Sequence, residues 1–142
     1  MYRKPEDEPF LIIVDDKSVA AIDAATGEEA WRRVLDDDGF AISRMLIDGD
    51  FIYIARATLL CCLRYTTGET LWGTRLAERR YDDRLVNLAL LRHRGRLFHR
   101  GFGRVSALDV SSGEVLWQRA MSSSLVEAFA FGFPGDVNQA DV

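Results

Sequence analysis

The sequence predicts an all-β protein made of three four-stranded, antiparallel blades of a β-propeller. One motif occurs three times and predicts it: AIDAATGEEAW (21–31), CLRYTTGETLW (62–72) and ALDVSSGEVLW (107–117). The glycines of the three copies lie 41 and then 45 residues apart. A fixed period in this range, with strand-like content, is typical of propeller blades. Short apolar runs between turn residues supply the strands, and no stretch has a convincing helical period.

The centre of each copy is a turn that needs glycine. A short hairpin built on a type I turn ends at positive φ, where only glycine is free of steric cost. Gly27, Gly68 and Gly113 occupy that position. A hydroxyl residue precedes each glycine, and Asp23 and Asp109 can accept hydrogen bonds at the start of two of the turns. The second copy has arginine instead of this aspartate, so its turn is expected to lose one cap.

A tryptophan follows each glycine by four residues, as Trp31, Trp72 and Trp117. A tryptophan that recurs once per unit buries a large area and keeps one N–H for a partner. We therefore expect the three side chains to be structurally equivalent and largely buried between neighbouring blades. Replacing one of them by alanine is expected to cost about 3–5 kcal/mol.

The strands are expected in an order that leaves the first blade incomplete. Their predicted ranges are 10–14, 18–23 and 29–35, then 41–47, 51–56, 59–64 and 69–76, then 85–91, 96–100, 104–109 and 114–120, and finally 125–131. The chain thus begins without one inner strand and ends with a spare one. This is the order of a ring in which strands from both chain ends complete one blade. Residues 1–9 are expected to be a flexible arm and residues 132–142 a flexible tail.

The pattern Ala-x-Asp-x-x-Thr-Gly-x-x-x-Trp resembles the repeats of the PQQ-like β-propellers, which are also called quinoprotein-dehydrogenase-like or tryptophan-docking repeats. The resemblance covers nearly all of residues 10–131 and implies the propeller fold. It implies no single function, because the family includes both cofactor enzymes and non-enzymatic scaffolds.

Composition and charge bound the function classes. A chain of 142 residues that is 48% hydrophobic can bury one core, and a formal charge of −4 argues against a general nucleic-acid binder. Residues 1–50 carry a net charge of −7 and residues 51–110 a net charge of +6, so different faces could attract one another between molecules. The charged N-terminus has no apolar run of signal length, and no stretch approaches a membrane span. The expected location is cytoplasmic, or periplasmic if an export signal has been removed.

Cys61 and Cys62 are the two cysteines of the chain. In the quinoprotein alcohol dehydrogenases that the repeats resemble, a disulfide between adjacent cysteines lies against the quinone ring. Here the pair lies within a strand run, where small apolar cysteines are common core residues. We expect both to be reduced and buried, and we expect no cofactor.

The run RHRGRLFHRGFGR (92–104) interleaves basic and aromatic residues. Such a run can bind nucleic acid, contact a protein or form an ordinary solvated face, and of the two binding roles we favour contact with an acidic protein. The candidate contact residues are Arg92, Arg94, Arg96, Arg100 and Arg104. His93 and His99 have no further ligand at zinc spacing, and we find no catalytic constellation or metal site.

These observations favour a non-enzymatic protein-interaction module on a self-assembled propeller. The alternatives are a small immunity protein that neutralises a toxin, and an enzyme or ligand binder with a site in the propeller channel. Because propellers have about 4–8 blades, three blades are too few and two copies would supply six. The expected partners are a second copy and another protein, and residues 125–131 of one copy are expected to pair with residues 10–14 of the other.

Overall fold

A computed structural model describes residues 9–15, 17–35, 43–56, 58–76, 88–101, 104–120 and 132–134. These residues form eleven strands in three antiparallel sheets, which confirms the predicted all-β, three-blade architecture. Blade 1 contains β1 (Phe10–Val14), β2 (Ser18–Asp23) and β3 (Glu29–Val34). Blade 2 contains β4 (Arg44–Asp48), β5 (Phe51–Ala55), β6 (Leu59–Arg64) and β7 (Thr70–Arg75). Blade 3 contains β8 (Ala89–His93), β9 (Arg96–Gly101), β10 (Arg104–Asp109) and β11 (Val115–Ala120).

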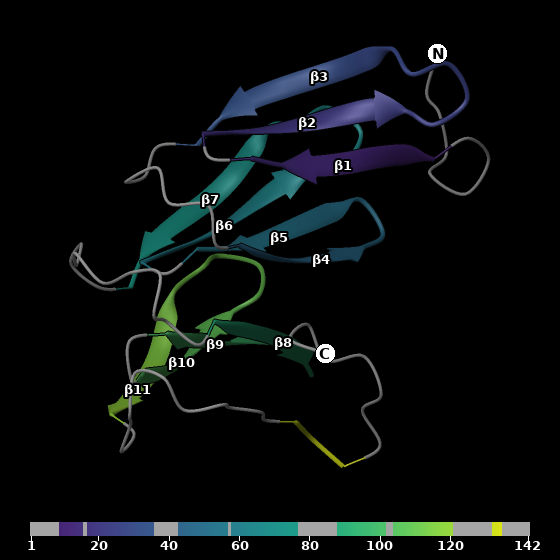
Figure 1. Ribbon diagram of the computed structural model, residues 1–142. Helices are drawn as coiled ribbons and strands as arrows, with labels where there is room; N and C mark the ends of the chain where they lie inside the picture. Colours follow the sequence, from purple (N-terminus) through teal and green to yellow (C-terminus); the bar gives the residue numbers. More distant parts are fainter. Residues whose placement is uncertain are drawn as a thin grey trace.

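The three blades are stacked one above another, with blade 2 between the other two (Figure 1). Because side chains alternate between the two faces of a strand, blade 2 contributes to two separate cores. Ile52 and Ile54 of β5 belong to the core shared with blade 1. Tyr53, which lies between them in sequence, belongs to the core shared with blade 3. The two cores hold the blades together as a stack.

Each motif turn also contains an irregularity in strand register at the same place. The shift follows Ala21 in blade 1, Cys62 in blade 2 and Ala107 in blade 3. These three small residues pair directly with the three motif tryptophans. A small residue opposite each indole leaves room for the ring to lie over the sheet, which explains the small residue at the start of the motif.

Two predicted strands begin later than expected, because β4 starts at Arg44 and β8 starts at Ala89. The predicted arm at residues 1–8 and the predicted spare strand at residues 125–131 lie outside the described residues. Among the described strands, β1 pairs with β2 alone, so blade 1 has three strands where the other blades have four. Within the same ranges, no helix is long and apolar enough to cross a membrane.

Candidate functional site

The three motif turns have nearly identical backbones. The φ angles of Gly27, Gly68 and Gly113 are +79°, +77° and +76°, which confirms that the turn requires glycine. In the first turn, Asp23 Oδ1 accepts a hydrogen bond from the amide of Ala25 at 2.8 Å. In the third, Asp109 Oδ1 accepts the equivalent bond from Ser111 at 2.8 Å, and bonds from Ser111 lower the pKa of Asp109.

The second turn, which has Arg64 in place of this aspartate, receives its cap from another part of the blade. Asp50 Oδ1 accepts a hydrogen bond from the amide of Thr66 at 3.0 Å, the position equivalent to Ala25. Asp50 Oδ2 is also 3.1 Å from Arg64 Nη1, and this ion pair raises the pKa of Arg64. The predicted loss of a cap is therefore wrong, because a carboxylate from the β4–β5 turn replaces it.

Blades 1 and 2 meet at a joint made by Trp31 and the second motif turn. The indole lies directly on Gly68, where any Cβ would overlap the ring. Trp31 Nε1 donates a hydrogen bond to the carbonyl oxygen of Tyr65 at 2.9 Å. Arg33 Nε donates to the carbonyl oxygen of Gly68 at 2.9 Å. Both donors lie on β3, so the edge strand of blade 1 is hydrogen-bonded to the backbone of the next blade.

Blades 2 and 3 meet at a joint of the same design. The Trp72 ring lies on Gly113, where a Cβ would again overlap it. Trp72 Nε1 donates to the carbonyl oxygen of Val110 at 3.2 Å, and Thr74 Oγ1 donates to that of Gly113 at 2.6 Å. Each joint thus has the same three parts. They are a ring on the glycine, an indole bond to the carbonyl three residues before that glycine, and a donor two residues after the tryptophan.

Trp117 occupies the same register as the other two tryptophans but is 46% exposed. The expectation that all three are largely buried is therefore wrong for Trp117 in a single chain, because no described blade follows blade 3. At the other end of the stack, Gly27 is exposed, and nothing in the described structure lies within 4 Å of a Cβ built on it. Gly68 and Gly113 are buried under their tryptophans. The described part of the chain thus presents one uncovered tryptophan and one uncovered turn.

Cys61 and Cys62 are not joined by a disulfide, and both are buried, as predicted. Strand alternation separates them, because Cys61 packs in the core with blade 1 and Cys62 in the core with blade 3. Burial raises the pKa of the Cys62 thiol to about 11, despite the opposing effect of Arg64. A thiol with this pKa is almost wholly protonated at neutral pH and is a poor nucleophile.

We therefore expect both cysteines of the folded protein to resist a thiol-specific disulfide reagent at pH 8. Only the thiolate reacts, and both sulfur atoms are buried. The reaction should be at least about 100-fold slower than in protein unfolded by guanidinium, because burial both protonates Cys62 and blocks access. Stopped-flow absorbance measures the two rates. Rapid labelling of either cysteine in the native state would contradict the prediction.

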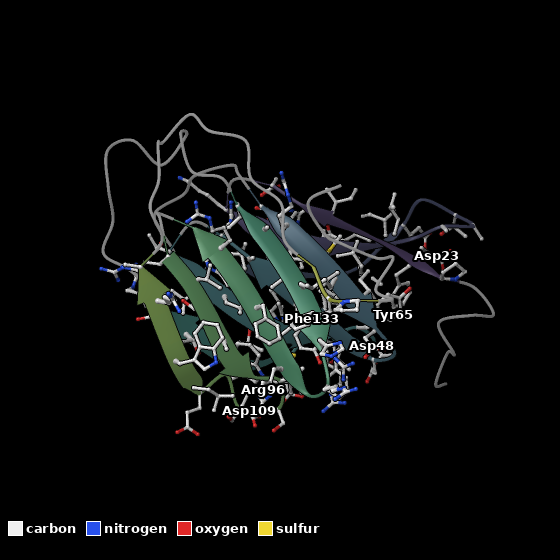
Figure 2. All side chains as sticks on the ribbon, turned by 90° about the horizontal axis from the view of Figure 1, so that it is seen from below. Asp23, Asp48, Tyr65, Arg96, Asp109 and Phe133 are labelled. Atoms are coloured by element: carbon white, nitrogen blue, oxygen red, sulfur yellow. The ribbon has the colours of Figure 1, made fainter. Side chains whose placement is uncertain are left out.

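The predicted arginine run divides between the two ends of blade 3. Arg92, Arg94 and Arg96 are exposed near the β8–β9 turn, and Arg92 Nη1 lies 3.3 Å from Asp48 Oδ2 of blade 2. Arg104 is exposed at the far end of the sheet, whereas Arg100 is buried. Figure 2 shows Arg96 and Asp48 at the same edge of the stack. The structure thus brings three of the five predicted contact residues together.

The two histidines have different surroundings. His99 is buried, and its Nε2 lies 3.0 Å from the carbonyl oxygen of Arg56, as expected for a donor N–H. Burial lowers the pKa of His99 to about 4. His93 stacks on Phe133 with ring centroids 4.0 Å apart, a contact that was not predicted for the tail. In the described part of the chain, no group of three or more His, Cys, Asp or Glu residues is arranged to hold a metal ion.

A cavity of about 340 Å³ opens between the end of β3 and blade 2. Gly73 lies in its wall, at the position that Arg32 and Gln118 occupy after the other two tryptophans. The absence of a side chain at Gly73 therefore widens the space beside Cys61. The lining residues are Val34, Leu35, Leu59, Cys61, Thr70, Gly73 and Arg75.

Sequence reasoning missed the residues that complete the joints. Arg33 and Thr74 each lie two residues after a motif tryptophan, as Arg119 does after Trp117, and this spacing was a signal that aligning the three copies could have revealed. Asp50 gave no such signal, because it caps a turn from 16 residues away.

Comparisons with solved structures show the same architecture. The chain is similar to BamB from Moraxella catarrhalis, at 23% identity and a TM-score of 0.59, over 78% of this chain and 34% of that protein. It is also similar to the quinohemoprotein alcohol dehydrogenase from Comamonas testosteroni, at 21% identity and a TM-score of 0.58, over 78% of this chain and 19% of that one. The computationally designed Ika8 protein matches 94% of this chain and 39% of its own, at 16% identity and a TM-score of 0.63.

The chain thus spans between about a fifth and two fifths of the length of these three proteins. No curated protein sequence matches it. A family model described as outer membrane protein assembly factor BamB matches residues 15–127, which include all three motif turns and all three tryptophans. The chain therefore belongs to this family of PQQ-like β-propeller proteins.

Proposed function

We propose that the chain is a non-enzymatic protein-interaction module built on a self-assembled PQQ-like propeller. One observation carries the proposal: side chains that are buried between blades have exposed counterparts at the end of the stack. Ile52 and Ile54 of β5 are 0% exposed beneath blade 1. Leu11 and Ile13, at the same positions of β1, are 58% and 46% exposed. An aliphatic row exposed in this way is typical of a surface that packs against protein.

The first expected partner is a second copy. Two copies would place six blades in one ring, within the range of about 4–8 that propellers use. Among the described strands, β1 has no neighbour on its second edge, where Tyr65 Oη already bonds the backbone N–H and carbonyl of Phe10 at 2.6 and 3.0 Å. A further strand would add beside the rest of this edge. The predicted donor, residues 125–131 of the second copy, lies outside the described residues, so this strand exchange stays a prediction.

The second expected partner is an acidic protein that binds beside the β8–β9 turn. Arg94 and Arg96 are exposed there, and Arg92 lies beside them in an exposed ion pair with Asp48. Guanidinium groups form bidentate hydrogen bonds with carboxylates, and they are enriched in protein interfaces. The BamB description of the family, which names an assembly factor, supports an interaction role of this general kind.

The tagged chain tests this function when it is captured from its native cells. The proposal expects a protein to co-purify stoichiometrically, and the double variant Arg94→Glu, Arg96→Glu to reduce its recovery at least 10-fold, because both charges reverse. Arg104→Glu is the control, because it changes the same charge at the far end of the sheet. Equal recovery with both variants, or nucleic-acid binding that persists at about 200 mM salt, would refute the proposal.

The cavity beside Gly73 favours one alternative, a binder of small ligands. Its volume of about 340 Å³ lies at the lower end of the range of ligand sites, and the similar quinohemoprotein alcohol dehydrogenase supplies a precedent for cofactor chemistry on this fold. Mass spectrometry of the natively purified protein, before and after unfolding, distinguishes the two functions. A stoichiometric small molecule released on unfolding would favour the ligand binder. The variant Gly73→Leu, which fills the cavity, should then abolish its retention.

A further inference from the structure

We propose that Trp117 of one copy docks on the Gly27 turn of a second copy, and that two such joints close a six-bladed ring. This inference rests on the self-assembly in the proposed function and names the residues that perform it. It takes the two joints inside the chain as the pattern for a third joint between chains.

The tryptophan half of the joint is complete in blade 3. Trp117 is 46% exposed and projects from the same register position as Trp31 and Trp72. Two residues later, Arg119 is exposed and repeats the chemistry of Arg33, which donates to a glycine carbonyl in the first joint. The end strand β11 therefore offers both the ring and the guanidinium that a docked blade uses.

The receiving half is complete in blade 1. Gly27 has the same positive φ as the two covered glycines, and it has open space where their tryptophans lie. Ala24, three residues before it, is exposed and corresponds to Tyr65 and Val110, whose carbonyl oxygens accept the indole bonds. In the proposed joint, Trp117 Nε1 donates to the carbonyl of Ala24, and Arg119 donates to that of Gly27.

A second copy fits better than an unrelated protein because each chain carries one free half of each kind. Two copies related by a two-fold axis along the channel satisfy both halves at once, with no tryptophan or turn left over. Charge supports the pairing, because in the proposed joint Arg119 meets a turn that carries Glu28, which is exposed.

Phe133 is the competing occupant of the open face of blade 3, because its ring packs on His93 and Phe98. Its ring lies over β8 and β9, toward the edge of the sheet that is opposite β11 (Figure 2). Trp117 keeps its exposure with Phe133 in place. Phe98 lies between the two rings, 4.9 Å from Phe133 and 6.2 Å from Trp117. A second copy docked on Trp117 would therefore meet Phe133 at the border of the docking surface.

Light scattering coupled to size exclusion tests the joint on the full chain. The wild type is expected at about twice the 16.0 kDa of one chain. Trp117→Ala removes the indole ring, and Gly27→Ala places a Cβ where that ring would dock. Each variant should therefore elute as a monomer of half that mass. Gly95→Ala is the matched control, because Gly95 has a φ of +77° and equally open space but lies in the β8–β9 turn.

Mixing the two monomeric variants separates a lost joint from a lost fold. The Gly27→Ala chain still has its tryptophan and the Trp117→Ala chain still has its turn, so an equimolar mixture should form a dimer with one intact joint. Each variant alone should stay monomeric with a β-sheet circular dichroism spectrum like that of the wild type.

The outcomes also distinguish this inference from the proposed function. If both variants stay dimeric, self-assembly stands but uses another surface, and the Trp117 joint is refuted. If the wild type is a stable monomer at about 100 μM, far above the Kd of a standard interface, the joint and the self-assembled ring are both refuted. Co-purification of the acidic partner then decides the remaining protein-binding function.

Discussion

Gly68→Ala is expected to lower the free energy of unfolding by about 3–5 kcal/mol, as much as the loss of a buried tryptophan, because it displaces one. A Cβ at this position would overlap the Trp31 ring, and the ring cannot move aside without leaving the core shared by blades 1 and 2. The positive φ of Gly68 adds a further cost for any residue with a Cβ. Urea unfolding followed by circular dichroism measures the change.

Gly95→Ala is the control for the backbone cost alone. It has the same φ of +77° with nothing within 4 Å, so it should cost only about 1–2 kcal/mol. In a Trp31→Ala background, Gly68→Ala should fall to that same lower cost, because the ring that it displaces is already absent. If Gly68→Ala and Gly95→Ala destabilise the protein equally, the ring does not rest on the glycine as described.

The fold could be predicted because its signals are local in sequence. Three glycines at a regular period specify three turns at positive φ, and the alternating apolar runs around them specify strands. The tryptophans gave the direction of packing, since an indole four residues beyond the turn must find a neighbour. The motif does not indicate whether a next blade is present for each tryptophan to pack on. Trp117 is exposed because no described blade packs on blade 3, and the repeat motif itself carries no information about this.

The candidate site was only partly predictable because it depends on which residues meet across blades. Asp50 caps the turn of Thr66 from another hairpin, and only the folded sheet brings the two together. The arginine run reads as one basic segment, yet strand geometry buries Arg100 and carries Arg104 to the far end of the sheet. The residues of the repeat specify how blades pack and carry no binding chemistry, so they do not identify a partner.

Stability is expected to fall by about 3 kcal/mol as the pH is lowered from 6.5 to 4, because His99 must stay neutral in the folded protein. Burial lowers its pKa from 6.5 to about 4, and the hydrogen bond to the Arg56 carbonyl offsets only part of this effect. Between these two pH values His99 is protonated in the unfolded chain but stays largely neutral in the folded chain. Stability therefore rises with pH across this window and is constant above it, at about 1.4 kcal/mol per unit of pKa difference.

His99→Gln isolates this effect, because glutamine keeps a donor N–H for the Arg56 carbonyl and does not titrate. Asp15 and Asp109, whose pKa values are lowered by hydrogen bonds from neighbouring amides and hydroxyls, add the same pH dependence to both proteins and cancel in the comparison. Urea unfolding of both proteins at several pH values between 4 and 7 gives the two slopes. The variant should lose most of the dependence that the wild type shows from pH 6.5 to 4. A wild type equally stable at both ends of the window would show that His99 accepts a proton in the folded state and that its site is open to water.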